Sequence, residues 1–86
     1  MIPPQILPLG RKILSKARKL NAEQKLIKAV KLLSDNPFHP SLNTELLQPK
    51  SLGFWSFRVD RKIRAIFIWR DDQRAIEILS LTAHYH

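Results

Sequence analysis

A change of hydrophobic period halfway along the chain is the feature that most constrains its fold. Between residues 11 and 35 apolar side chains recur every three or four positions, the period of an amphipathic helix. From residue 54 onward they alternate with polar ones in runs rich in β-branched and aromatic residues, the pattern of strands. Residues 36–53 lie between the two regimes and contain three prolines. We therefore expect an α+β fold in which helices cover one face of a small sheet.

The helical part is expected to form two antiparallel helices that meet near residue 20. Asn21 is suited to be an N-cap, and Gln24 three residues later completes a capping-box pattern, so the second helix should begin near Ala22. It has to end before Pro37, because the residue before a proline is pushed out of the helical region. Residues 36–53 show no sustained period and are interpreted as a structured loop.

Three strands are expected in the second part, at 54–59, 63–69 and 75–81. The polar connectors between them are short enough for hairpins, which favours an antiparallel meander. Alternation places one set of apolar side chains on a common face, and this face should meet the helices: Trp55, Phe57, Val59, Ile63, Ala65, Phe67 and Trp69.

The N-terminal segment is the hardest to interpret. Prolines at positions 3, 4 and 8 exclude a helix interior and leave at best a short edge strand at 5–7. Residues 1–86 as a whole should form a single domain, because a core of this size cannot be divided further.

Charge narrows the class of partner. Fifteen Lys and Arg residues against seven Asp and Glu give a formal net charge of +8, and most of the excess lies in the helical part. Such a surface favours polyanions or a strongly acidic partner protein.

The chain has no cysteine, which excludes a disulfide framework and a thiolate metal site. Its apolar runs are far shorter than a membrane-spanning helix, and the N-terminal residues do not resemble a signal peptide, so we expect a cytoplasmic protein without membrane association.

Two strand arginines are the first candidates for chemistry. Alternation directs Arg58 and Arg64 away from the helix-facing side. If their strands pair through the short turn, both guanidinium groups lie on one exposed face, where they could fork onto phosphate oxygens. The alternative is that they are merely solvated strand arginines.

The other candidates lie in the loop and at the chain end. His39 and Glu45 occupy the loop, and His84, Tyr85 and His86 follow the last strand. A carboxylate, two arginines and a His-Tyr pair would supply the base, the charge stabiliser and the acid of a metal-free ribonuclease. A solvated glutamate and a frayed terminus are the alternatives. A metal site is not expected, because two terminal histidines without an acidic cluster provide too few ligands.

Taken together, four segments resemble the RelE/ParE toxin superfamily, over about residues 11 to 86. They are Asn-Pro-Phe-His-Pro-Ser-Leu-Asn-Thr-Glu-Leu-Leu at 36–47, Gly-Phe-Trp-Ser-Phe-Arg-Val at 53–59, Ile-Arg-Ala-Ile-Phe at 63–67, and the closing His-Tyr. The Trp-Ser-X-Arg strand, the arginine of the next strand and the His-Tyr pair are most similar to the YoeB-like (Txe/YoeB) branch.

This resemblance implies the toxin of a type II toxin-antitoxin pair that cleaves mRNA in the ribosomal A site. The substrate's 2′-hydroxyl would attack the adjacent phosphate without any metal or cofactor. The resemblance assigns Glu45 as general base, Arg64 as the ligand of the scissile phosphate, and His84 and Tyr85 as aids to leaving-group protonation. Phosphate contacts are further expected from Arg58, Lys50, Lys12, Lys16 and Lys19.

The resemblance also implies partners. A cognate antitoxin would cover the basic surface with an acidic or amphipathic segment, in a toxin-antitoxin hetero-oligomer, and mRNA and the ribosome would be the targets. Members of the superfamily that poison DNA gyrase share the fold without the nuclease residues. A gyrase inhibitor without nuclease activity and an inactive binding module therefore remain open alternatives.

Overall fold

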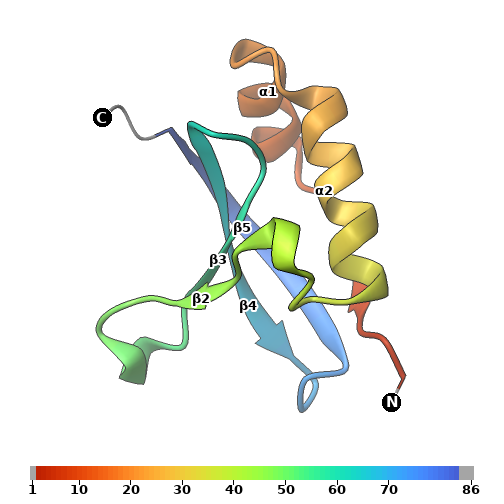
Figure 1. Cartoon of the computed structure of the whole chain (residues 1–86), viewed down its shortest axis with the longest axis vertical. Helices are drawn as coiled ribbons and strands as arrows, with labels where there is room; N and C mark the ends of the chain where they lie inside the picture. Colours follow the sequence, from red (N-terminus) through yellow and green to blue (C-terminus); the bar gives the residue numbers. More distant parts are fainter. Residues whose placement is uncertain (1, 84–86) are drawn as a thin grey trace.

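The computed structural model describes residues 2–83 and has two layers, with the helices on one side of a sheet (Figure 1). The helices are α1 (Arg11–Lys19) and α2 (Glu23–Asp35), and neither is long and apolar enough to cross a membrane. Two short 3-10 helices follow, η1 (Pro40–Leu42) and η2 (Lys50–Leu52). The strands are β1 (Gln5–Ile6), β2 (Glu45–Leu46), β3 (Trp55–Arg58), β4 (Ile63–Arg70) and β5 (Ala75–Ala83). The expected α+β class is confirmed.

The strands form one sheet in the order β1-β5-β4-β3-β2. The β3-β4-β5 meander is antiparallel, as expected, and β2 adds to it antiparallel to β3. The short edge strand expected near the N-terminus is present, but it runs parallel to β5. Its connection to the sheet includes the Gln5 N–H, which donates to the Arg74 carbonyl at 2.8 Å, and the Leu7 N–H, which donates to the Ile76 carbonyl at 2.9 Å.

The core lies between the helices and the face of the sheet that alternation predicts. Phe57, Ala65 and Phe67 are completely buried there, and Trp55, Val59 and Trp69 pack against them as partly buried residues. The helices contribute the side chains that recur at helical spacing: Ile13, Ala17, Leu26, Ala29 and Leu33. Burial of this apolar surface is the main force that holds the two layers together.

The role predicted for Asn21 was wrong. Asn21 adopts a left-handed conformation (φ 55°) and ends α1, with its N–H donating to the Arg18 carbonyl at 3.1 Å. The Ala22 N–H donates to the Ala17 carbonyl at 2.8 Å, which completes a Schellman motif. The N-cap of α2 is Ala22, and no side chain caps that helix. Asparagine is favoured both as an N-cap and in the left-handed region, so the sequence alone did not distinguish the two roles.

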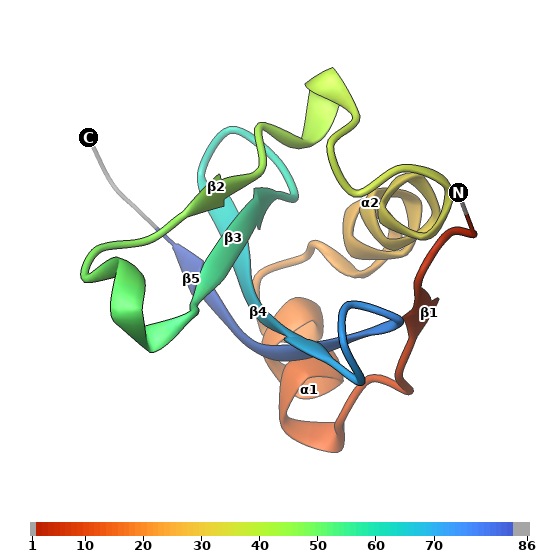
Figure 2. The same cartoon turned by 90° about the horizontal axis from the view of Figure 1, so that it is seen from below.

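The segment interpreted as a loop, 36–53, also contains a strand. Glu45 and Leu46 pair with Ser56 and Trp55, which makes β2 an edge of the sheet. Two residues are too few to display a period, so the strand left no pattern in the sequence. As Figure 2 shows, β2 and the η2 turn extend from the side of the sheet opposite β1.

Two hairpin turns connect the strands of the meander, and both contain acidic residues. In the β3-β4 turn, Asp60 Oδ1 accepts hydrogen bonds from the Lys62 and Ile63 N–H groups, both at 2.8 Å. In the β4-β5 turn, Asp71, Asp72 and Gln73 all have positive φ, at 51°, 52° and 69°. The second turn is therefore strained, because L side chains clash with the backbone in this region.

Replacing Gln73 with glycine should stabilise the protein by about 0.5–1 kcal/mol. Glycine removes the left-handed penalty, and its greater freedom in the unfolded chain offsets part of the gain. Urea unfolding monitored by circular dichroism measures the change. Asp72→Gly is the matched comparison and should gain less, since aspartate tolerates this region better. A destabilised Gln73→Gly protein would contradict the strain argument.

The stability contributed by Asp60 should depend on pH. Partial burial alone raises the pKa of Asp60, but hydrogen bonds from the Lys62 N–H and the Lys25 ammonium, with further donors, lower it by more, so it lies below the ordinary 3.8. The ionised carboxylate therefore stabilises the fold above the unfolded-state pKa, and this contribution is lost as the pH falls through the folded-state pKa.

We expect Asp60→Asn to lower the free energy of unfolding by about 1 kcal/mol at neutral pH. The difference from the unmodified protein should shrink at an acidic pH below the folded-state pKa, where the carboxylate loses its charge. Urea unfolding at both pH values tests this, with Asp71→Asn as a control in an exposed turn. A difference that stays constant with pH would show that the charge of Asp60 contributes nothing.

Candidate functional site

The face of the sheet that points away from the helices carries the polar candidates. Strand register places Arg58 of β3 directly opposite Arg64 of β4, and Glu45 of β2 opposite Ser56 of β3. Because their neighbours in each strand point into the core, these four side chains share the open face. The two arginines are therefore cross-strand neighbours, as their spacing around the Asp60 turn predicts.

Arg64 is held in position from two sides. Its Nε donates to the Ser56 hydroxyl at 2.9 Å, and its Nη2 donates to the Asn43 carbonyl at 2.6 Å. The same Nη2 lies 3.8 Å from the nearer carboxylate oxygen of Glu45. The Arg64 side chain is only 20% exposed, whereas that of Glu45 is 62% exposed. A fixed guanidinium thus stands beside a carboxylate that solvent and ligands can reach.

The local structure explains how these partners come together. Asn43 is the C-cap of η1 and adopts a left-handed conformation (φ 49°), which ends the 3-10 turn two residues before β2 begins at Glu45. His39 begins the same turn and accepts a hydrogen bond from the Ser41 N–H at its Nδ1, at 3.1 Å. His39 is therefore a capping residue of η1 in this structure.

Ser56 is a positioning residue that the sequence interpretation missed. It is the one polar residue buried in the described part of the chain, at 2% exposure, and its hydroxyl is satisfied by Arg64. The sequence contained a signal for it, because this serine stands between Trp55 and Phe57, two positions before Arg58. A buried hydroxyl needs a partner, and the hairpin register brings Arg64 within reach.

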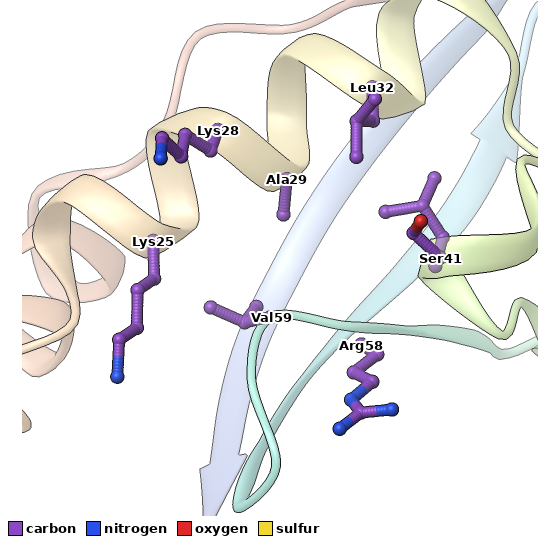
Figure 3. Close-up of a pocket in the computed structure, with 8 residues that line it drawn as sticks. Lys25, Lys28, Ala29, Leu32, Ser41, Arg58 and Val59 are labelled. Carbon is purple, nitrogen blue, oxygen red and sulfur yellow. The ribbon is translucent and has the colours of Figure 1, made fainter.

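A basic groove adjoins Arg58 between α2 and β3 (Figure 3). Lys25 and Lys28 of α2 line it together with Arg58, and its volume is about 180 Å³. Lys25 and Arg58 lie on either side of Val59, which forms part of an apolar floor with Ala29, Leu32 and Leu42. The Lys25 ammonium also donates to Asp60 Oδ2 at 3.3 Å. The positive surface around Arg58 is thus extended by two lysines that were not among the predicted site residues.

The other predicted contacts are not gathered around Arg64. Lys12, Lys16 and Lys19 are exposed on α1, which packs against β5 in the helical layer and so lies across the sheet from Arg64. Lys50 is exposed at the start of η2, in the connection between β2 and β3. His84 and Tyr85 lie outside the described residues. Within residues 2–83 no three His, Cys, Asp or Glu side chains form a group that could hold a metal ion.

The pairing of Arg58 with Arg64 is unfavourable for the fold by itself. Like charges directly opposite each other on two strands repel, with an effect of roughly 0.2–1 kcal/mol. A phosphate bound between the two guanidinium groups would relieve this repulsion, since each group can direct N–H donors at phosphate oxygens.

Arg58→Thr should therefore raise the free energy of unfolding by a few tenths of a kcal/mol, because it removes the repulsion and threonine favours strands. Urea unfolding at low ionic strength is the measurement. Arg58→Lys is the control and should show no gain, as it keeps the charge. If Arg58→Thr is instead less stable, Arg58 contributes to packing more than it costs in repulsion.

Comparison with known proteins supports the fold and extends over nearly the whole chain. A YoeB/ParE toxin from Agrobacterium tumefaciens has a similar structure, with a TM-score of 0.69 and 15% identity, over 96% of this chain and 99% of that one. The archaeal RelE-RelB complex from Pyrococcus horikoshii contains a chain with a TM-score of 0.71, 15% identity and 96% coverage of both chains. A chain of the heterotetrameric YoeB-YefM toxin-antitoxin complex from Staphylococcus aureus has a TM-score of 0.67 and 18% identity, over 95% of this chain and 98% of that one.

No protein-family model and no curated protein sequence matches the chain. The predicted resemblance to the RelE/ParE toxins, with YoeB-like relatives, is thus confirmed for the fold.

Proposed function

We propose that this protein is the toxin of a toxin-antitoxin pair and that it cleaves mRNA on the ribosome without a metal ion. The observation that carries the proposal is the arrangement around Arg64, whose guanidinium is fixed by Ser56 and Asn43 at 3.8 Å from the accessible carboxylate of Glu45. The fold shared with YoeB and RelE toxins supports it. Fold alone would not decide between activities, so the site carries the argument.

The proposed reaction transfers a phosphoryl group within the RNA. Glu45 takes the proton from a 2′-hydroxyl, whose oxygen then bonds to the adjacent phosphorus. The bond from phosphorus to the 5′-oxygen of the next nucleotide breaks, which leaves a 2′,3′-cyclic phosphate and a 5′-hydroxyl. Arg64 stabilises the charge that develops on the phosphate oxygens, and a donor held in place before the reaction is most effective in this role. His84 and Tyr85 are proposed to protonate the leaving oxygen, as the resemblance implies.

The basic surface fits the proposed targets. Arg58 stands next to Arg64 and leads to the groove lined by Lys25 and Lys28, so a phosphate backbone could continue from the reacting phosphate toward α2. The proposed location is the cytoplasm, where translation takes place. An antitoxin is the proposed partner, because two of the similar structures are toxin-antitoxin complexes, YoeB-YefM and RelE-RelB.

Arg64→Gln should lower mRNA cleavage by about 10²–10³-fold, the usual effect of removing one donor to transition-state charge. Glutamine can still donate to Ser56, so the variant should fold. The assay is a translation reaction programmed with a defined mRNA, in which primer extension maps new 5′ ends. Lys12→Ala is the control: it removes a charge on α1 that contributes only to polyanion affinity and should have a much smaller effect.

The same assay distinguishes the alternatives. New ends at A-site codons that require ribosomes and Arg64 support the nuclease. Equal effects of Arg64→Gln and Lys12→Ala would count against a site centred on Arg64. Toxicity that persists without cleavage in Glu45→Gln, Arg64→Gln and His84→Gln would indicate a gyrase inhibitor, and expression that harms no cell would indicate an inactive binding module.

A further inference from the structure

A second groove, of about 570 Å³, lies on the helix-facing side of the sheet, away from Arg64. It is bounded by the N-terminal residues Ile2–Pro4, by the end of α2 with the following Asp35–Phe38 segment, and by Asp72 and Gln73 of the β4-β5 turn. Trp55 and Trp69 line its wall. Nothing in the proposed nuclease chemistry uses this groove, although its volume is in the range of ligand-binding sites.

The wall of the groove is a continuous aromatic array. Phe38 meets Trp55 edge to face with ring centroids 5.8 Å apart, Trp55 stacks on Phe67 at 6.3 Å, and Phe67 meets Trp69 at 5.7 Å. Phe67 is completely buried and fixes the two tryptophans from behind, whereas Phe38 is 56% exposed and Ile2 is 91% exposed. Large apolar side chains that remain in water beside a concave aromatic wall are typical of a recognition surface.

The charge of the groove is opposite to that of the protein. Asp35 and Asp72 line it and no Lys or Arg does, in a chain with fifteen basic and seven acidic residues. Within residues 2–83 the four ion pairs involve neither of these carboxylates.

Helix α2 adds to this negative potential. Its last turn carries no basic residue and ends at Asp35, whereas the last turn of α1 carries three basic residues. An acidic side chain at the negative end of a helix dipole is unfavourable for stability. Asp35 therefore does not stabilise α2, and its carboxylate is free to meet a cation.

We propose that this groove binds a peptide segment of a partner protein in which an arginine or lysine stands next to an apolar or aromatic side chain. The apolar side chain fills the space beside Phe38 and Ile2. The cation lies against a tryptophan face, where the ring quadrupole attracts it, and within reach of Asp35 or Asp72. A nucleic acid is disfavoured because its phosphates would meet these two carboxylates.

The test uses the protein's own fluorescence, because its two tryptophans both line the groove. The probes are acetylated, amidated hexapeptides of serine that carry one Leu or Phe next to one Arg or Lys. We expect a saturable change in tryptophan emission with at least one of them, and none with the matched peptides in which glutamate replaces the basic residue. Because the net charge of the chain is +8, acidic peptides should be attracted to the rest of its surface. A preference for basic peptides would therefore indicate binding in the acidic groove.

Single substitutions locate the binding. Asp72→Asn should weaken it by about fivefold, as expected for loss of one charge partner of a bound cation. Asp71→Asn is the matched control: it lies in the same turn with nearly the same φ (51° against 52°) but does not line the groove. Asp35→Asn should weaken binding while making the free protein more stable, a combination that a purely structural role cannot produce.

Several outcomes would overturn the proposal. They are no change of emission with any basic peptide, an equal change with the acidic peptides, or equal weakening by Asp71→Asn and Asp72→Asn. A dimer in sedimentation that Phe38→Ser abolishes would assign the groove to a second copy of the chain instead. Because no residue of the proposed active site is altered, loss of nuclease activity and loss of peptide binding are independent results.

Discussion

The pairing of β4 with its two neighbours is the interaction on which the rest of the structure depends. Along β4, Ala65 and Phe67 point into the core under the helices. Arg64, the second residue of the strand, points to the open face. A shift of the register by one residue would exchange these faces and bury the guanidinium. The Asp60 turn holds this register, since its carboxylate ties the backbone of the next strand. Core packing and the placement of the candidate site therefore depend on the same strand register.

Two charge arrangements in the molecule are unfavourable for the fold. Arg58 opposite Arg64 repels across two strands, and Asp35 ends α2 where the helix dipole is negative. Neither arrangement helps the chain to fold, and they lie on different faces. The molecule thus has two chemically opposite surfaces, a basic one over the sheet and an acidic aromatic one beside the helices.

Elements with a sustained period could be predicted from the sequence, and of the two strands that have only two residues, β1 alone was expected. The helices, the three long strands and the buried face of Phe57, Ala65 and Phe67 follow from periods of 3.6 and 2. Asn21 was assigned to the wrong helix end because its side chain suits both. Strand β2 was missed because two residues have no period. Arg58 and Arg64 were placed on one face by alternation, but Ser56 and the Asn43 carbonyl became visible only once the hairpin and η1 had fixed their distance from Arg64.

The parallel ladder between β1 and β5 has a consequence for how the molecule opens. It joins the two ends of the sequence through two residue pairs, Gln5 with Ala75 and Ile6 with Ile76, and so closes the longest loop in the sheet. Few hydrogen bonds hold this edge strand to the sheet. The edge at β1 is therefore the part of the sheet that can detach while the β3-β4-β5 meander stays folded, as a separate unit of local unfolding. Because Ile2–Pro4 form one wall of the aromatic groove, each such opening widens that groove.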